Sequence, residues 1–171
     1  MVAIDAWARI IRPELVSVGD HVRIDAGVLI SASHPVRLGD HVHLAAGTKI
    51  FASGGAIEIE SFANLSADVK VYSASDDYTG GYLTNPTVPA EYKQVTRAPV
   101  YIGGHAIIGA GSVILPGVTL GLGSAVGALS LVREDVEEGV VVAGVPARPI
   151  GRRDTDRLVA LEAMLKDGRL P

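Results

Sequence analysis

The stretch that decides the fold is IGAGSVILPGVTLGLGSAVGA, residues 108–128. It places an aliphatic residue at Ile108, Ile114, Leu120 and Val126, six residues apart each time. A period of six belongs neither to an α-helix nor to a lone strand, whose side chains alternate with a period of two. Sustained along a chain, it is typical of a solenoid built from short strands.

The period of six extends in both directions from this stretch. Fifteen positions in one register are all Val, Ile or Leu: Val18, Ile24, Ile30, Leu38, Leu44, Ile50, Ile59, Leu65, Val71, Ile102, Ile108, Ile114, Leu120, Val126 and Val132. The period of six is interrupted after every third hexad, which predicts a three-sided coil of about 18 residues and about five stacked coils. An ordinary β-sandwich, the alternative, would show alternation with a period of two.

Composition narrows the class of protein. The chain has 171 residues, 48% of them hydrophobic, which is enough for one compact domain. Its net charge of −4, without a basic block, argues against nucleic-acid binding. The absence of cysteine excludes disulfides and thiolate sites. Asp5 and Arg9 interrupt the apolar N-terminal run, and no stretch is long enough to span a membrane, so we expect a cytoplasmic protein.

The chain divides into two expected parts. Residues 1–150 form the solenoid, which an insertion at residues 73–99 interrupts. The sequence DTDRLVALEAMLKDG then reads as a helix that Asp154 or Thr155 can cap. Because an open solenoid end exposes its core, we expect residues 151–171 to be a helical cap.

The insertion carries the candidate active site. Long loops without regular structure are usually functional or disordered, and the aromatic and proline residues here favour an ordered one. Asp76 and Asp77 are the candidate catalytic carboxylates; as an alternative, both are only turn formers. The candidate substrate-binding residues are Tyr78, Tyr82 and Asn85.

The C-terminal coils carry a resemblance to a known family. The segments IGGHAIIGAGSVILPGVTLGLGSAVGALSLV, residues 102–132, and VVAGVPARPI, residues 141–150, are similar to those of hexapeptide-repeat acyltransferases, including galactoside and maltose O-acetyltransferases and sugar acetyltransferases of surface-polysaccharide pathways. The resemblance covers residues 16–150. It implies an all-β, left-handed parallel β-helix, a homotrimer with active sites at the subunit junctions, and acetyl-CoA as co-substrate.

The resemblance also exposes a departure at the expected base. The similar O-acetyltransferases carry a catalytic histidine where this sequence has Asp76. Imidazole, with a pKa near 6.5, suits the activation of a hydroxyl, whereas a free aspartate near 3.9 is a much weaker base. Two explanations remain open: Asp76 and Asp77 share a site that raises one pKa, or the acceptor is an amine that needs only a carboxylate. His105 is the second candidate base, although its corner position favours a solvent-facing turn residue.

The family pattern further implies a site for acetyl-CoA. By position, Ala110 and Ala128 would lie along the pantetheine arm, where small side chains leave room for it. Arg133 and Arg148 are candidates to pair with the phosphates of CoA, because guanidinium groups match phosphate geometry. Solvated arginines without a ligand are the alternative.

The sequence therefore predicts an acetyl-CoA-dependent sugar acetyltransferase. We expect an amino or hydroxyl group of a nucleotide-linked sugar, or of a precursor of a surface polysaccharide such as lipopolysaccharide, to attack the thioester directly. Two alternatives stay open: a metal hydratase like the hexapeptide-repeat carbonic anhydrases, and a non-catalytic solenoid that acts as a binding scaffold. His41 and His43 are two residues apart, not five as in those zinc enzymes, so no metal site is expected.

Overall fold

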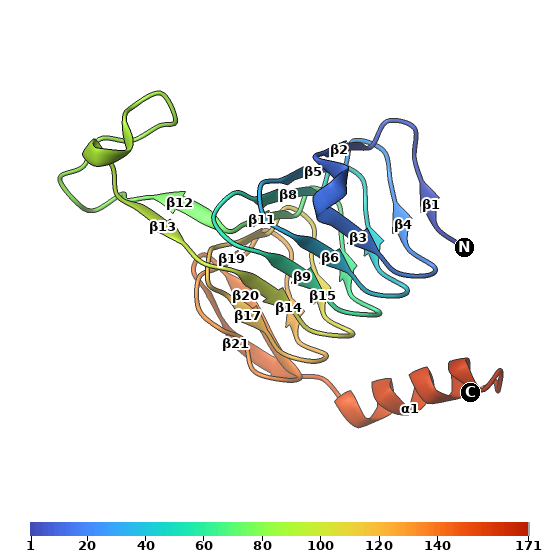
Figure 1. Cartoon of the computed structure of the whole chain (residues 1–171). Helices are drawn as coiled ribbons and strands as arrows, with labels where there is room; N and C mark the ends of the chain where they lie inside the picture. Colours follow the sequence, from blue (N-terminus) through green and yellow to red (C-terminus); the bar gives the residue numbers. More distant parts are fainter. Residues whose placement is uncertain (171) are drawn as a thin grey trace.

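The computed structural model describes residues 1–170, and its body is a prism of three β-sheets whose strands run parallel, except for the last strand of sheet A (Figure 1). Sheet A contains β1 (Ala3–Ile4), β4 (Arg23–Ile24), β7 (His43–Leu44), β10 (Asn64–Leu65), β15 (Ile107–Ile108), β18 (Ala125–Val126), β20 (Val140–Gly144) and β21 (Ala147–Arg152). Sheet B contains β2 (Arg9–Ile11), β5 (Leu29–Ala32), β8 (Lys49–Ala52), β11 (Lys70–Tyr72), β16 (Val113–Ile114) and β19 (Leu131–Val132). Sheet C contains β3 (Val16–Val18), β6 (Val36–Leu38), β9 (Ile57–Ile59), β14 (Val100–Ile102) and β17 (Thr119–Leu120).

The hexad residues form the core, as the sequence predicts. In sheet A, Ile24 pairs with Leu44, Leu44 with Leu65 and Leu65 with Ile108, so equivalent residues of successive coils stack directly. Of the fifteen hexad positions, fourteen are buried, and only Val18 in the first coil is half-buried. Close stacking of aliphatic side chains along one axis therefore replaces the bulky aromatic core that this composition does not provide.

The solenoid is longer than the sequence indicates. The seven parallel strands of sheet A, β1 to β20, correspond to about seven turns, not about five. Ile4, Ile10 and Ile11 indicate only a partial coil before residue 16, because the 3-10 helix η1 (Pro13–Leu15) delays the next strand; the structure shows a full turn there. The last turn was missed because the hexad rhythm stops after Val132.

The chain passes from sheet A to B to C in each coil, so the prism has A–B, B–C and C–A corners. Every interruption of the period falls at the B–C corner. Most of the longest one, residues 73–99, forms an arm that projects from the body (Figure 1). The arm contains the antiparallel pair β12 (Ala74–Asp76) and β13 (Val95–Arg97) and the 3-10 helix η2 (Ala90–Tyr92). The prism therefore presents one outgrowth, from a single edge.

The C-terminal segment leaves the solenoid in two steps. Strand β21 turns back and pairs antiparallel with β20. The helix α1 (Thr155–Lys166) then runs along the C–A corner, and the side chain of Asp154 caps it by accepting a hydrogen bond from the Arg157 backbone N–H at 2.9 Å. None of the helices described in residues 1–170 is long and apolar enough to cross a membrane.

Candidate active site

The root of the arm is fixed by Ser73, which is buried. Its hydroxyl oxygen accepts hydrogen bonds from the backbone N–H groups of Gly54, at 2.9 Å, and Gly55, at 3.1 Å. A Cβ atom on Gly54 would lie 2.5 Å from the Ser73 carbonyl oxygen, so only glycine permits this close approach. Because the hydrogen bonds from Gly54 and Gly55 fix Ser73, Asp76, three residues further on, has a defined place at the B–C corner.

Asp76 faces a groove of about 450 Å³ between the arm and sheet B. The groove is lined by Tyr72, Ala74, Ser75, Asp76, Tyr78, Val113 and Leu115. The carboxylate is half-buried, and its Oδ2 atom accepts a hydrogen bond from the Asn85 backbone N–H at 3.3 Å. Within residues 1–170 this is the one hydrogen bond to the carboxylate, which leaves Oδ1 available to a ligand. A single oriented carboxylate beside an apolar floor is suited to bind an amine.

Asp77 makes different contacts from Asp76. Its Oδ1 atom accepts hydrogen bonds from the Thr79 backbone N–H, at 2.8 Å, and from the Thr79 hydroxyl, at 3.0 Å. These bonds stabilise the ionised form and lower the pKa of Asp77, although slight burial opposes them. The shift is opposite to the raised pKa expected of a carboxyl base, so Asp77 matches the alternative of a turn former.

The three candidate substrate-binding residues lie on the arm but differ in their exposure. Tyr78 lines the groove, although 90% of its surface is exposed, and Tyr82 is half-exposed. The Asn85 side chain is occupied locally, because its Oδ1 accepts hydrogen bonds from the Thr87 backbone N–H at 2.9 Å and the Thr87 hydroxyl at 2.6 Å. Asn85 thus contacts Asp76 through its backbone.

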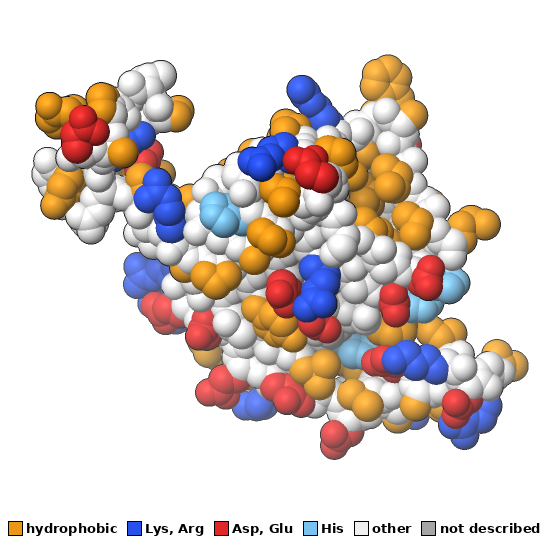
Figure 2. All heavy atoms as spheres, viewed as in Figure 1, with side chains coloured by type: hydrophobic (Ala, Val, Ile, Leu, Met, Phe, Trp, Pro, Cys, Tyr) orange, Lys and Arg blue, Asp and Glu red, His pale blue; other side chains and the backbone are white. Residues whose placement is uncertain are grey.

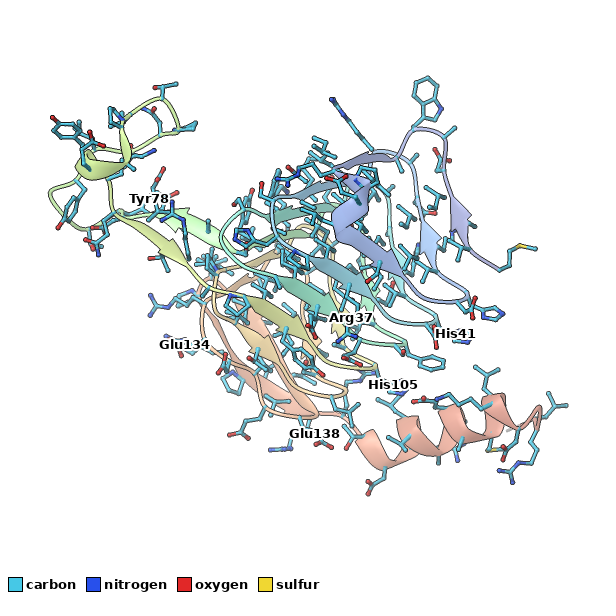
Figure 3. All side chains as sticks on the ribbon, in the orientation of Figure 1. Arg37, His41, Tyr78, His105, Glu134 and Glu138 are labelled. Atoms are coloured by element: carbon cyan, nitrogen blue, oxygen red, sulfur yellow. The ribbon has the colours of Figure 1, made fainter. Side chains whose placement is uncertain are left out.

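His105 lies at another corner of the prism from Asp76. It belongs to the C–A corner, and Figure 3 shows it beside α1, on the opposite side of the body from Tyr78 of the arm. Its ring stacks on Phe62 with the centroids 5.0 Å apart. Its Nε2 atom contacts Glu162 of α1. One protomer therefore does not bring His105 to Asp76, and the histidine is already engaged in a structural contact.

Histidine and phenylalanine rings form a stack at the C–A corner. His21 stacks on His41 and His41 on Phe62, both with centroids 4.6 Å apart. All of these residues, with His105, have positive φ angles between 57° and 64°, the left-handed conformation that the corner requires. Their common corner geometry explains why they recur at one place in the hexad.

Ala110 and Ala128 belong to a longer column at the A–B corner. Five alanines occupy the same place in successive coils: Ala26, Ala46, Ala67, Ala110 and Ala128. The carbonyl oxygen of each of the first four accepts a hydrogen bond from a backbone N–H of the next coil, at 2.9 to 3.1 Å. Ala110 and Ala128 are both exposed. The corner is therefore a smooth track on which an extended ligand could lie close to the backbone.

Arg133 and Arg148 line one groove at the C-terminal end of the prism, with a volume of about 370 Å³. Glu134 connects them: its carboxylate lies 3.4 Å from Nε of Arg133 and 3.7 Å from Nη1 of Arg148. Both guanidinium groups are more than half exposed and keep free N–H donors. The structure thus brings together two cations that are 15 residues apart in sequence.

Sequence reasoning missed the floor of the Asp76 groove. Tyr72 follows the buried Val71, and Leu115 follows the buried Ile114. Because strand side chains alternate, the residue after each hexad position must face outward, and parallel register places equivalent ones side by side. The pattern was therefore available in the sequence, but the place of the arm above it was not.

Metal ligands do not converge in the described part of the chain. No group of three or more His, Cys, Asp or Glu residues in residues 1–170 could hold a metal ion. His41 stacks at the C–A corner, whereas His43 lies on sheet A, with Nε2 at 2.9 Å from Asp25 and Nδ1 at 3.0 Å from Asn64. The two histidines thus point into separate networks.

Comparison with known proteins gives consistent results. Residues 16–52 and 99–128 match the family described as hexapeptide repeat of succinyl-transferase. The dTDP-4-amino-4,6-dideoxy-D-glucose acyltransferase of Escherichia coli is 41% identical over 151 residues, which cover 88% of this chain and 78% of that protein. The galactoside O-acetyltransferase of E. coli K12 is 49% identical over 59 residues, 34% of this chain and 29% of that enzyme.

The fold is shared with solved structures over nearly the whole chain. AntD, an N-acyltransferase from Bacillus cereus in complex with dTDP and 3-hydroxybutyryl-CoA, superposes with a TM-score of 0.90 at 39% identity, covering 97% of this chain and 87% of that one. Variants of AntD with one aspartate replaced, in complex with dTDP and coenzyme A, superpose with TM-scores of 0.89 and 0.90.

Proposed function

The chain belongs to the hexapeptide-repeat acyltransferases, and we propose that it transfers the acetyl group of acetyl-CoA to the amino group of a nucleotide-linked amino sugar. The observation that carries this proposal is the carboxylate of Asp76, which is held at the root of the arm and faces a groove with an apolar floor. The E. coli relative named for a dTDP-linked amino sugar supports the same substrate class.

Asp76 suits an amine better than a hydroxyl as acceptor. Imidazole is the usual base that activates a sugar hydroxyl, and a carboxylate is in general a much weaker base for that step. An amino sugar arrives as an ammonium ion, which a carboxylate binds directly and from which it can accept a proton. The neutral amine is then a strong nucleophile without further activation. The description of AntD as an N-acyltransferase supports this choice.

The reaction then proceeds by direct transfer. The ammonium group gives one proton to Asp76, and the freed nitrogen lone pair attacks the thioester carbonyl carbon. As the C–N bond forms and the C–S bond breaks, the second proton of the nitrogen neutralises the departing thiolate. The products are an amide and free coenzyme A. No covalent bond to the protein is required, and backbone N–H groups near the thioester oxygen would stabilise the oxyanion.

Acetyl-CoA is proposed to lie along the A–B corner. The exposed Ala110 and Ala128 leave space for a thin pantetheine chain, and Arg133 and Arg148 provide cations at the C-terminal end for its phosphates. The binding of coenzyme A or 3-hydroxybutyryl-CoA by AntD supports an acyl-CoA site in this fold. We propose that the reaction takes place in the cytoplasm, in the synthesis of surface polysaccharides.

We propose a homotrimer in which the arm of one protomer reaches the next. Asp76 lies at the B–C corner and the alanine column at the A–B corner, so a second copy would complete one site. The tip of the arm exposes apolar side chains away from the body (Figure 2), among them Leu83 and Tyr92, both 58% exposed. Sedimentation equilibrium of the purified chain should give three times the mass of 17.7 kDa; a monomer at micromolar concentration would contradict this assembly.

The activity is tested by following thiol release from acetyl-CoA with a set of acceptors. We expect turnover with nucleotide-linked amino sugars, and mass spectrometry should find one acetyl group on the nitrogen. The matched hydroxyl sugars, which differ only at the reacting group, should give little thiol release. Equal rates with both, or none with any amine, would contradict the proposal.

A further inference from the structure

The outward face of sheet B differs in charge from that of sheet C. Its outward positions are Arg9, Ile11, Leu29, Ser31, Lys49, Phe51, Lys70, Tyr72, Val113, Leu115, Leu131 and Arg133. They include four cations and no acidic residue, although the whole chain has 19 acidic and 15 basic residues. On sheet C, by contrast, Arg37 pairs with Glu58 at 3.4 Å, and Figure 2 shows acidic and basic side chains together on that face.

Two of these cations stand side by side without an anionic partner. Lys49 and Lys70 are paired residues of β8 and β11. Their ammonium groups donate to the carbonyl oxygens of Gly47 and Asp68, each at 3.1 Å. Within residues 1–170 no carboxylate forms an ion pair with either lysine. The carboxylate of Asp68, which is the nearest one along the chain, lies against Gly47 instead. Like charges directly opposite on neighbouring strands are unfavourable, so this pair is suited to an anion.

An aromatic pair lies beside the lysines on the same two strands. The rings of Phe51 and Tyr72 are stacked, with centroids 5.0 Å apart and an angle of 12° between the planes. Tyr72 also lines the groove of Asp76. Since Lys70 and Tyr72 are two residues apart on one strand, their Cα atoms are separated by about 7 Å. The carboxylate groove, the aromatic surface and the lysine pair are thus consecutive along one face.

We propose that this face binds the nucleoside diphosphate part of the acceptor, with Lys49 and Lys70 on the diphosphate and Tyr72 against the sugar. The inference rests on the function proposed above. In a nucleotide-linked sugar the diphosphate is attached at one side of the sugar ring, and a reactive amine can stand at the other side. This order matches the face, where the lysines come first, Tyr72 lies in the middle and Asp76 lies at the far end. Ammonium groups bind phosphate oxygens through charge-assisted hydrogen bonds.

Coenzyme A also carries a diphosphate, but its place is elsewhere on the prism. The lysine pair belongs to the third and fourth coils, on the N-terminal side of Val113 and Leu115 in the floor of the groove. Arg133 and Arg148, the proposed partners of CoA, lie at the C-terminal end. The two phosphate-bearing substrates would therefore approach Asp76 from opposite ends of the solenoid.

Calorimetry with dTDP and with coenzyme A, measured separately, distinguishes the two sources. We expect Lys49→Gln and Lys70→Gln each to weaken dTDP binding about tenfold, and the double variant about a hundredfold, with coenzyme A affinity unchanged. Lys166→Gln, the same substitution on α1, is the control and should bind dTDP like the wild type. Lys70→Arg should retain most of the affinity, since it keeps the charge.

Three outcomes would overturn the inference: dTDP affinity that the lysine variants do not change, weakened binding of coenzyme A with unchanged dTDP binding, or no dTDP binding by the wild type. Circular dichroism checks that each variant is folded. Thiol release with nucleotide-linked amino sugars separates this failure from that of the proposed function. If the wild type acetylates these sugars and the lysine variants have an unchanged KM for them, only the proposed phosphate subsite is wrong. If the wild type transfers acetyl to no amine, the proposed function is wrong.

Discussion

The Nε2 atom of His105 lies 2.5 Å from the Oε2 atom of Glu162, which joins the solenoid corner to the C-terminal helix. Four residues further along α1, Lys166 contacts the same carboxylate and stands 6.0 Å from the centre of the Phe62 ring. Successive coils are about 4.8 Å apart, and four helical residues advance about 6 Å. Because these two distances are similar, helix residues four apart can reach successive coils. The helix is thereby held along the corner at several coils.

Replacing Glu162 with Gln should loosen this helix without unfolding the solenoid. The substitution keeps the size of the side chain but removes the negative charge that both His105 and Lys166 contact. We therefore expect the free energy of docking the helix to weaken by about 1 kcal/mol. Hydrogen exchange should become faster in residues 155–166 only. Faster exchange in the core strands as well would show that the helix supports the whole fold.

Acid should have the same effect on the wild type. Burial raises the pKa of Glu162, but hydrogen bonds from Lys166 and His105 outweigh it and lower the pKa below the usual 4.5. A carboxyl whose pKa is lower in the folded state contributes stability above its unfolded pKa, and that contribution is lost as the pH falls through the folded value. Helix exchange should therefore accelerate below about pH 4.5, and Glu162→Gln should flatten that dependence.

Asp76→Asn should lower turnover strongly and leave acetyl-CoA binding intact. The amide cannot accept the proton of the ammonium group, so we expect kcat to fall by a factor of about 10² to 10⁴. The affinity for acetyl-CoA, measured by calorimetry, should stay within about twofold, because Asp76 is proposed to contact the amine of the acceptor and not the pantetheine or the phosphates of CoA. The Asp77→Asn variant, which weakens only a turn, should lose less activity. Equal losses in both would assign the two carboxylates a shared role.

The hexad pattern predicted the body of the fold because it records a simple physical repeat. Each position such as Leu65 or Ile108 is stacked on its equivalents above and below, so one residue type is required at a fixed interval. Local sequence therefore contained the register, the core and the corner stack of His41 and Phe62. The first coil was predictable only in part, because η1 interrupts its period of six.

The site was less predictable because it depends on relations between distant segments. The sequence indicated Asp76, but not that Asn85 holds it or that Val113, 37 positions later, forms its floor. His105 was a candidate base because it follows the arm closely in sequence, yet its Nε2 atom contacts the carboxylate of Glu162, 57 positions away. Such contacts follow from how the arm and the helix pack on the prism, which no local pattern encodes.

The core should tolerate little loss of volume. Ile114 is fully buried and pairs with Val71 and Val132 in neighbouring coils. Ile114→Ala leaves a cavity in a column where the backbone cannot collapse, so we expect a destabilisation of about 2–5 kcal/mol in urea unfolding. Val113→Ala, one residue away but half-buried, is the control and should cost much less. Similar losses in both would mean that the column relaxes around the cavity.

A larger side chain at Ala128 should block acetyl-CoA without harming the fold. The side chain of Ala128 is exposed, so Ala128→Leu removes no core contact and should leave urea unfolding unchanged. Leucine would project into the space proposed for pantetheine, and we expect the KM for acetyl-CoA to rise about tenfold or more, with little change for the acceptor. The matched control is Ala26→Leu, an exposed alanine in the same column four coils away. It should bind acetyl-CoA like the wild type; if both variants weaken acetyl-CoA equally, or neither does, the A–B corner near the C-terminal end is not the pantetheine track.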